Sequence, residues 1–107
     1  MTEYILVCIT AGSPQEAEAL AKAVVERNLA ACGNVIPDVR SVFWWKDAIE
    51  TDQEALLLLK SRAAIFPELC RVVKSLHSYD VPEIIALPIL TGSDEYLAWI
   101  DAETQQE

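Results

Sequence analysis

The side chains that could bind a metal ion are few in this sequence. It has a single histidine, His77, and three cysteines, Cys8, Cys32 and Cys70. Imidazole nitrogen and thiolate sulfur are ligands that copper and similar divalent ions accept readily. If the protein has a metal site, we expect His77 to form it with Cys8 or with a nearby carboxylate such as Glu83.

Each of these residues also has a structural interpretation. His77 stands at the expected end of a helix, where an imidazole interacts favourably with the last carbonyl groups. Cys8 and Cys32 fit the role of small buried hydrophobes, and Cys70 lies near the apolar face of a helix. One chain offers too few His and Cys ligands for a closed metal site, so a site shared between subunits is an alternative.

Lys60 is the most suggestive single charge in the chain. It follows four consecutive leucines, at 56–59, so its ammonium emerges from a strand that is expected to be buried. A charge in such a place needs an anionic partner. Glu54 or Glu83 could supply one, and so could an anionic ligand.

Three aromatic side chains, those of Trp45, Tyr79 and Trp99, could line a cleft for an organic ligand. They could equally pack in an interface between subunits. If a cleft forms between subunits, we expect it to bind a small anionic or zwitterionic metabolite. Its expected lining consists of Trp45, Glu54, Lys60, Tyr79, Glu83 and Trp99.

Sequence patterns of catalysis are lacking. The chain has only three glycines, none clustered into a phosphate-binding loop, and neither a Ser-His-Asp signature nor an H-E-x-x-H motif. A lone histidine makes most histidine-dependent catalysis improbable. We therefore predict a protein that is not an enzyme and that has no organic cofactor.

Composition and charge exclude several classes of partner. The 107 residues form one expected domain, 1–107, and are 52% hydrophobic. A net charge of −9 repels the phosphates of nucleic acids and anionic membrane surfaces. The cysteines are odd in number and widely spaced, which fits reduced thiols. The first residues lack the basic segment that begins a secretory signal. We predict a cytoplasmic protein that spans no membrane.

The hydrophobic pattern predicts the order β-α-β-β-α-β followed by an extra C-terminal helix. This is the order of the ferredoxin-like α+β fold, in which two helices cover one face of a four-stranded antiparallel sheet. The other face is then bare and apolar. Gly33 is expected to cap the first helix, and the tail after Ala102 is expected to fray. The expected strands are 3–10, 35–46, 49–62 and 84–89, and the expected helices are 14–32, 63–76 and the stretch from 93.

The second and third strands predict an unusually long hairpin. Arms of about 12 residues at about 3.3 Å each reach roughly 40 Å, whereas a compact domain of this size has a radius of gyration of about 13 Å. The hairpin must therefore project from its domain or bend sharply. Its residues 42–45 (VFWW) place large apolar groups on both faces. We infer that another copy of the chain covers them. A scaffold whose only biochemical role is to assemble is a further alternative.

Four segments together resemble the family of the divalent-cation tolerance protein CutA, and the likeness covers nearly the whole chain. The resemblance implies a ferredoxin-like homotrimer whose hairpins wrap neighbouring subunits. It also implies kinship with the PII signalling proteins, which sense small molecules between subunits. The segments are LAAC at 29–32, SVFWWK at 41–46 with Glu54 and LLLK at 57–60 downstream, HSYDVPEI at 77–84, and DEYLAWI at 94–100.

The resemblance implies a function in the response to metal ions, with copper or another divalent cation bound. A PII-like sensor or adaptor with a ligand cleft between subunits is the alternative.

Some positions depart from the family pattern. Ser78 replaces a proline, which predicts a less rigid loop, and Asp47 replaces a glycine of the hairpin turn. Ile9 rather than Cys8 matches the family's cysteine, and Leu76 stands where a second histidine is usual.

Overall fold

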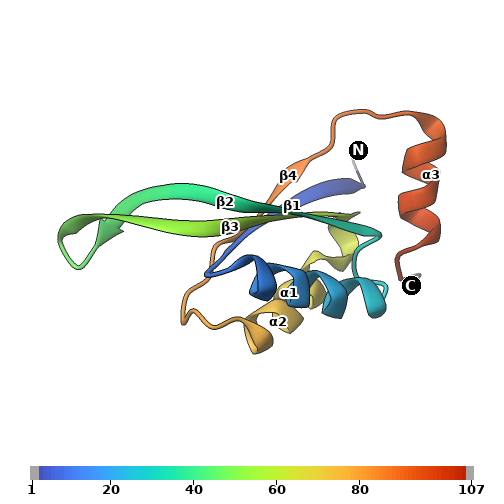
Figure 1. Cartoon of the computed structure of the whole chain (residues 1–107). Coiled ribbons are helices and arrows are strands. Elements are labelled where there is room, and N and C mark those ends of the chain that lie inside the picture. The colour runs from blue at the N-terminus through green and yellow to red at the C-terminus, as the bar shows by residue number, and fades with distance from the viewer. Residues whose placement is uncertain (1–2, 106–107) are drawn as a thin grey trace.

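The computed structural model describes residues 3–105, which form one sheet and three helices. The four strands pair in the order β2-β3-β1-β4, and every neighbouring pair is antiparallel. Helices α1 and α2 lie under one face of this sheet (Figure 1). The predicted ferredoxin-like fold is confirmed. The elements are β1 (Tyr4–Ala11), α1 (Pro14–Glu26), β2 (Cys32–Trp45), β3 (Ala48–Arg62), a 3-10 turn (Ala63–Ile65), α2 (Phe66–Leu76), β4 (Ile84–Pro88) and α3 (Asp94–Ala102).

Alternation along the strands builds the core. In β1 every second side chain is buried, because successive side chains point to opposite faces of a strand. The buried set faces the apolar stripes of α1 and α2. These side chains lose their contact with water together, which is the main source of the domain's stability. The largest fully buried ones are Val7, Ile9, Leu20, Val24, Leu29, Leu57, Leu59, Leu69, Val73 and Ile100.

Helix α1 begins as the sequence predicts and ends earlier. The Ser13 side chain accepts a hydrogen bond from the Glu16 amide at 3.1 Å, which caps the helix. The helix stops at Glu26, and Asn28 takes the left-handed conformation with φ 58°. The expectation that Gly33 caps this helix is wrong. Asparagine tolerates this backbone conformation better than other residues with a side chain, and Asn28 reaches it five residues earlier.

Gly33 instead lies within β2, where the helix passes close to the sheet. A Cβ atom at this position would lie 3.0 Å from the Cβ of Ala21 and 3.0 Å from a methyl of Leu59. The glycine therefore allows α1 to approach the sheet closely.

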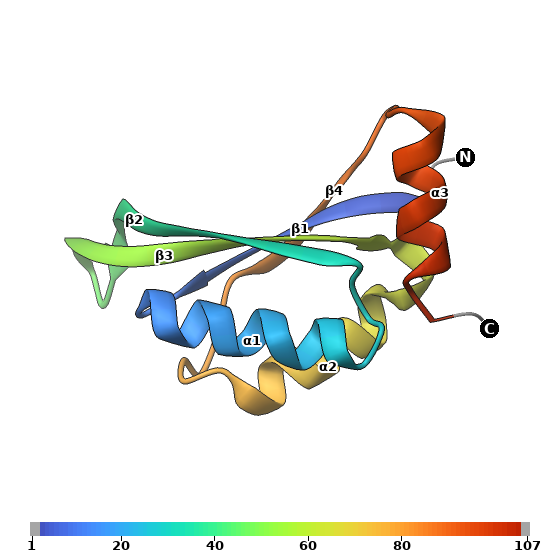
Figure 2. The same ribbon diagram turned by 45° about the vertical axis from the view of Figure 1, so that its right-hand side comes forward.

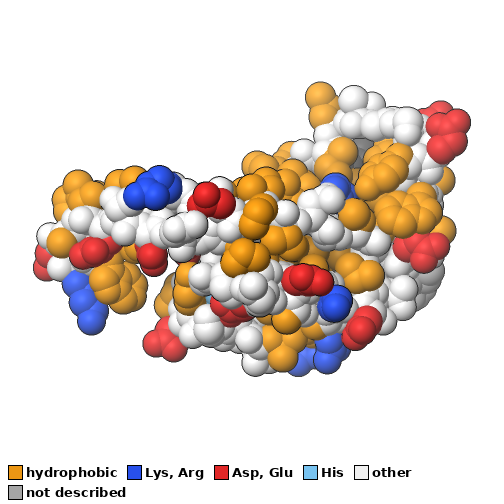
Figure 3. Space-filling model, in the orientation of Figure 1, with side chains coloured by type: hydrophobic (Ala, Val, Ile, Leu, Met, Phe, Trp, Pro, Cys, Tyr) orange, Lys and Arg blue, Asp and Glu red, His pale blue; other side chains and the backbone are white. Residues whose placement is uncertain are grey.

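The hairpin of β2 and β3 extends past the helices on one side (Figures 1 and 2). The described chain measures 44 × 25 × 22 Å along its principal axes. Lys46 and Asp47 form the turn with φ values of 50° and 67°, the backbone of a two-residue turn that suits a twisted hairpin. The prediction of a projecting hairpin is confirmed. Figure 3 shows hydrophobic side chains on both sides of its end, and Trp44 is 72% exposed.

The face of the sheet opposite α1 and α2 carries a second set of apolar side chains. We call it the open face and define it by alternate positions of β1, β3 and β4. Ile85 and Leu87 are about half exposed, and the members from β1 and β3 are partly buried. The open face consists of Leu6, Cys8, Leu56, Leu58, Ile85 and Leu87, with Cys8 opposite both Leu58 and Ile85.

The C-terminal segment is anchored rather than frayed up to Gln105. The buried Arg62 donates through Nε to Thr104 Oγ1 at 2.9 Å and through a second nitrogen to the Gln105 carbonyl. The predicted fraying is therefore wrong for 103–105, and 106–107 lie outside the described residues. No helix within 3–105 is long and apolar enough to cross a membrane.

Two leucine truncations separate core packing from surface effects. Leu59→Ala removes a side chain that is 0% exposed and leaves a cavity, so we expect it to lower the free energy of unfolding by about 2–5 kcal/mol. Leu90→Ala makes the same chemical change at a residue that is 89% exposed, so we expect a change below about 0.5 kcal/mol. Denaturant unfolding at one protein concentration measures both. Equal losses would contradict the described core.

Candidate metal-binding and ligand-binding residues

The His77 side chain is fully buried, and both of its ring nitrogens have partners. Nε2 donates to the Thr10 carbonyl at 2.7 Å, while Nδ1 accepts from the Tyr79 amide at 3.0 Å. Nε2 must carry a proton, because the Thr10 carbonyl can only accept a hydrogen bond. A metal ion needs the lone pair that the Tyr79 amide occupies. In this chain His77 therefore links the loop after α2 to the end of β1.

Glu16 is a site residue that sequence reasoning missed. Its carboxylate accepts hydrogen bonds from the amides of Gly12 at 3.2 Å and Ser78 at 2.8 Å, and from the Ser78 hydroxyl at 3.0 Å. Burial raises the pKa of Glu16, but these hydrogen bonds and the nearby His77 outweigh burial and hold the pKa below its ordinary value. The only sequence signal was a glutamate three residues after Ser13, which predicts a helix cap and not a contact with residue 78.

Ser78 has a positive role where the family pattern has proline. Both its amide and its hydroxyl donate to Glu16, and proline could make neither bond. The loop is held by these two contacts, so the expected loss of rigidity is offset.

The structure brings Tyr79 and Glu54 together, as two of the predicted cleft residues. The Tyr79 hydroxyl donates to a Glu54 carboxylate oxygen at 2.7 Å. Burial first, and then the hydrogen bond and charge of Glu54, raise the pKa of Tyr79 far above its ordinary value. The phenol therefore stays protonated and joins the loop after α2 to β3.

Cys8 and Glu83 are close enough to interact electrostatically. Burial raises the pKa of the Cys8 thiol, and the negative charge of Glu83 raises it further. All three cysteines are free and partly buried, so none belongs to the fully buried core. Across residues 3–105, no three His, Cys, Asp or Glu side chains gather closely enough to hold a metal ion. One copy of this part of the chain does not assemble Cys8, His77 and Glu83 into a site.

Lys60 finds partners other than those expected. Its ammonium donates to the Asn34 side-chain oxygen and lies 3.9 Å from Cys32 Sγ. No salt bridge to Glu54 or Glu83 forms, which corrects the expected pairing within the described chain. The ammonium is partly buried beside neutral groups.

Apart from Tyr79 and Glu54, the predicted cleft residues lie in separate parts of one chain. Trp45 is at the hairpin end beneath Lys46, whereas Trp99 on α3 lines a surface cavity of about 410 Å³ together with Cys32. Glu54 and Lys60 are six residues apart on β3, roughly 20 Å at the usual rise of a strand. A single cleft lined by all six residues requires more than one copy of the chain.

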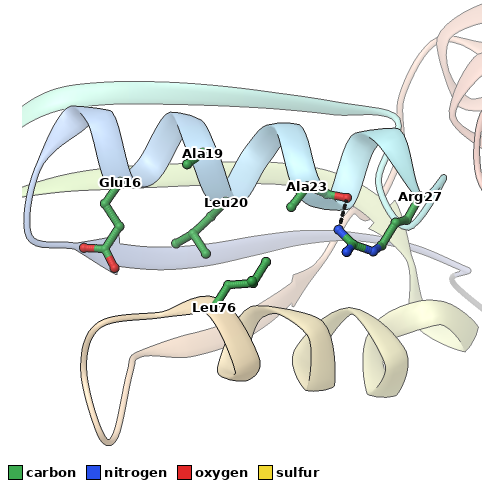
Figure 4. Close-up of a pocket in the computed structure, with 6 residues that line it drawn as sticks. All are labelled: Glu16, Ala19, Leu20, Ala23, Arg27 and Leu76. Atoms are coloured by element: carbon green, nitrogen blue, oxygen red, sulfur yellow. Dashed lines mark hydrogen bonds between the residues drawn. The ribbon is translucent and has the colours of Figure 1, made fainter.

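A groove between α1 and α2 contains none of the predicted residues (Figure 4). Its volume is about 340 Å³, and its lining is mostly apolar. Arg27 stands at one end and donates to the Ala23 carbonyl at 3.0 Å. Glu16, at the other end, points toward the loop after α2. The groove is lined by Glu16, Ala19, Leu20, Ala23, Arg27 and Leu76.

Comparison with known proteins identifies the family. The family described as CutA1 divalent ion tolerance protein matches residues 5–103. A Thermus thermophilus protein named divalent-cation tolerance protein CutA is 48% identical over 99 residues, which cover 92% of this chain and 96% of that protein. The chain belongs to the CutA family.

Solved structures of the family share the fold closely. The crystal structure of CutA1 from Oryza sativa aligns with a TM-score of 0.95 at 39% identity and covers 99% of this chain and 97% of that one. The Thermus thermophilus structure gives a TM-score of 0.93 at 46% identity and covers 95% of this chain and 99% of that one. The chain spans only 58% of the rice relative named Protein CutA 1, chloroplastic, at 40% identity over 95% of this chain. The family and fold predicted from the sequence are confirmed.

The Tyr79–Glu54 contact predicts a shifted titration. In a difference titration of phenolate absorbance between the wild type and Tyr79→Phe, we expect Tyr79 to ionise far above the ordinary tyrosine pKa of about 10. Glu54→Gln should lower the pKa of Tyr79, but burial should keep it above the ordinary value. Above pH 10 the unfolded chain loses this proton while the folded chain keeps it, so stability falls as pH rises. An unchanged Tyr79 pKa in Glu54→Gln would contradict the contact.

Proposed function

We propose that three copies of the chain assemble through the open face and the projecting hairpin, and that the homotrimer binds divalent cations, copper among them, in the response to metal ions. The observation that carries the assembly is the open face, which continues into an aromatic hairpin end that residues 3–105 leave exposed. The CutA resemblance supplies the number of copies.

The hairpin end alone provides a large driving force for assembly. Trp44 and Trp45 are 72% and 59% exposed. Covering them removes roughly 250 Å² of mostly apolar surface from water, about 6 kcal/mol as an upper bound. That is comparable to the stability of many whole domains. The open face adds to this energy.

The charge of the chain favours cations as ligands of the assembly. Each copy carries a net charge of −9, and assembly brings three such copies together. The resulting negative potential raises the local concentration of divalent cations.

Cys8 and Glu83 are the metal ligands that the structure supports best. They are the predicted pair that lie near each other, and Cys8 belongs to the open face, where another copy could add a third ligand. His77 can join them only if the Tyr79 amide releases Nδ1. Because the thiol must lose its proton to bind the ion, affinity should increase as pH rises toward the raised pKa of Cys8.

A charge placed on the open face tests the assembly. By size-exclusion chromatography with light scattering, we expect a three-copy mass for the wild type and for Leu90→Lys, which alters a residue that is already 89% exposed. Leu58→Lys places an ammonium where copies meet, so we expect the trimer to dissociate. Circular dichroism checks that each variant is folded. A folded Leu58→Lys protein that stays trimeric, or a monomeric wild type, would contradict the proposed assembly.

Two single cysteine variants, Cys8→Ser and Cys70→Ser, test the metal site. In native mass spectrometry with added Cu²⁺, we expect three ions on each wild-type trimer. Cys8→Ser and Glu83→Gln should each weaken binding about tenfold or more, as loss of a ligand or of its charged neighbour does. Cys70→Ser changes a thiol on α2, away from the open face, and should bind copper as the wild type does. Equal binding by Cys8→Ser and Cys70→Ser would exclude Cys8 as a ligand.

A PII-like sensor is the second candidate, because Lys60 carries a partly buried ammonium that no carboxylate of the described chain neutralises. An anionic metabolite between subunits would supply the missing charge. We expect a dicarboxylate or a nucleotide to change the tryptophan fluorescence of the wild type, and Lys60→Gln to lose that change. No response from the wild type to either class would count against this candidate.

A further inference from the structure

Cys32 and Lys60 face each other across the first rungs of the β2–β3 ladder. The strand register pairs the two residues directly, which places both side chains on the same side of the sheet. The Lys60 Nζ lies 3.9 Å from Cys32 Sγ. Because the ladder fixes their positions, the amine and the thiol are neighbours in every folded copy of the chain.

Neutral groups complete the surroundings of the pair. Lys60 also donates to the Asn34 side-chain oxygen, and Cys32 Sγ lies 4.0 Å from the same atom. The Tyr96 hydroxyl of α3 is close enough to Cys32 to interact with it electrostatically. Across the described chain no carboxylate pairs with Lys60, so the nitrogen has no salt bridge to break before it reacts.

The Cys32 residue is not closed off from solvent. Cys32 is only partly buried and lines the surface cavity of about 410 Å³ between α1, β2 and α3. Hydrogen peroxide is small enough to enter a cavity of this size, and an accessible thiol is the usual target of such an oxidant.

We propose that Cys32 and Lys60 form a peroxide-sensitive modification site at which oxidation joins the two side chains through an N–O–S bridge. A first peroxide transfers one oxygen to the thiol, which gives a sulfenic acid and water. A second peroxide removes two electrons from the sulfenic acid and the amine together. The S–O–H and N–H bonds break, an O–N bond forms, and two further waters leave. The ammonium releases its extra proton to solvent.

The other two cysteines provide internal comparisons. No lysine nitrogen lies within hydrogen-bond distance of Cys8 or Cys70 in residues 3–105, whereas Cys32 has the Lys60 ammonium beside it. Cys8 therefore has no neighbouring amine in this part of the chain with which to form the same bridge. Both side chains lie on the side of the sheet that carries Leu56 and Leu58. The proposed site needs neither metal binding nor a metabolite, so its failure and the failure of the proposed metal site are distinguishable.

Mass spectrometry of the intact, assembled protein treated with hydrogen peroxide tests the proposal. The bridge adds one oxygen and removes two hydrogens, a gain of about 14 Da that a thiol reductant should reverse. After trypsin digestion we expect peptides 28–40 and 47–62 to be joined, with Lys60 uncleaved. Cys70→Ser should form the bridge as the wild type does.

Lys60→Arg is the decisive variant, because it keeps the positive charge beside Cys32 but removes the reacting amine. It should lose both the gain of about 14 Da and the joined peptides while Cys32 still oxidises to the sulfenic acid. Cys32→Ser should lose both as well. The same products in Lys60→Arg would overturn the proposal. So would a wild type in which Cys32 yields only oxygenated acids or disulfides between copies.

Discussion

Successive side chains of a β-strand point to opposite faces of the sheet, and the rest of this structure depends on that constraint. In β1 and β3 one set of side chains packs against α1 and α2, and the opposite set, which includes Leu6, Leu56 and Leu58, is also largely apolar but is not covered by α1 or α2. Antiparallel sheets usually pair an apolar face with a polar one. Here the hairpin of β2 and β3 carries large apolar groups on both of its sides far beyond the helices. This uncovered apolar surface is the basis for our proposal that copies of the chain assemble.

Two polar clusters lie at opposite ends of the same sheet, and they differ in character. At one end His77, Tyr79 and Glu16 make closely spaced hydrogen bonds that fasten the loop after α2 to β1, α1 and β3. All of these groups have partners, so this end is suited to holding shape. At the other end Lys60 has only neutral acceptors, and Cys32 is its nearest sulfur. A charge without a counter-charge is suited to reaction or to ligand binding.

Local sequence patterns were enough to predict the fold. They did not predict which distant side chains contact one another. The order of elements, the Ser13 cap and the long hairpin follow from hydrophobic spacing and turn residues, which act over a few neighbours. Asn28 took the position expected of Gly33, because two residues compete to end a helix and the tertiary contact of Gly33 with α1 is invisible in sequence. The Lys60 partners depend on strand register, and the contact of Glu16 with Ser78 joins residues 62 positions apart.

The central claim is that copies of the chain cover the aromatic hairpin end. Acrylamide quenching of tryptophan fluorescence in a Trp99→Phe variant tests it most directly, since only Trp44 and Trp45 then remain. At assembly concentrations we predict quenching several-fold weaker than in the same variant carrying Leu58→Lys. Diluting the protein until the copies separate should increase the quenching by acrylamide. Quenching as strong as that of a solvent-exposed indole, and independent of dilution, would contradict the claim, because these side chains would then be uncovered in the native protein.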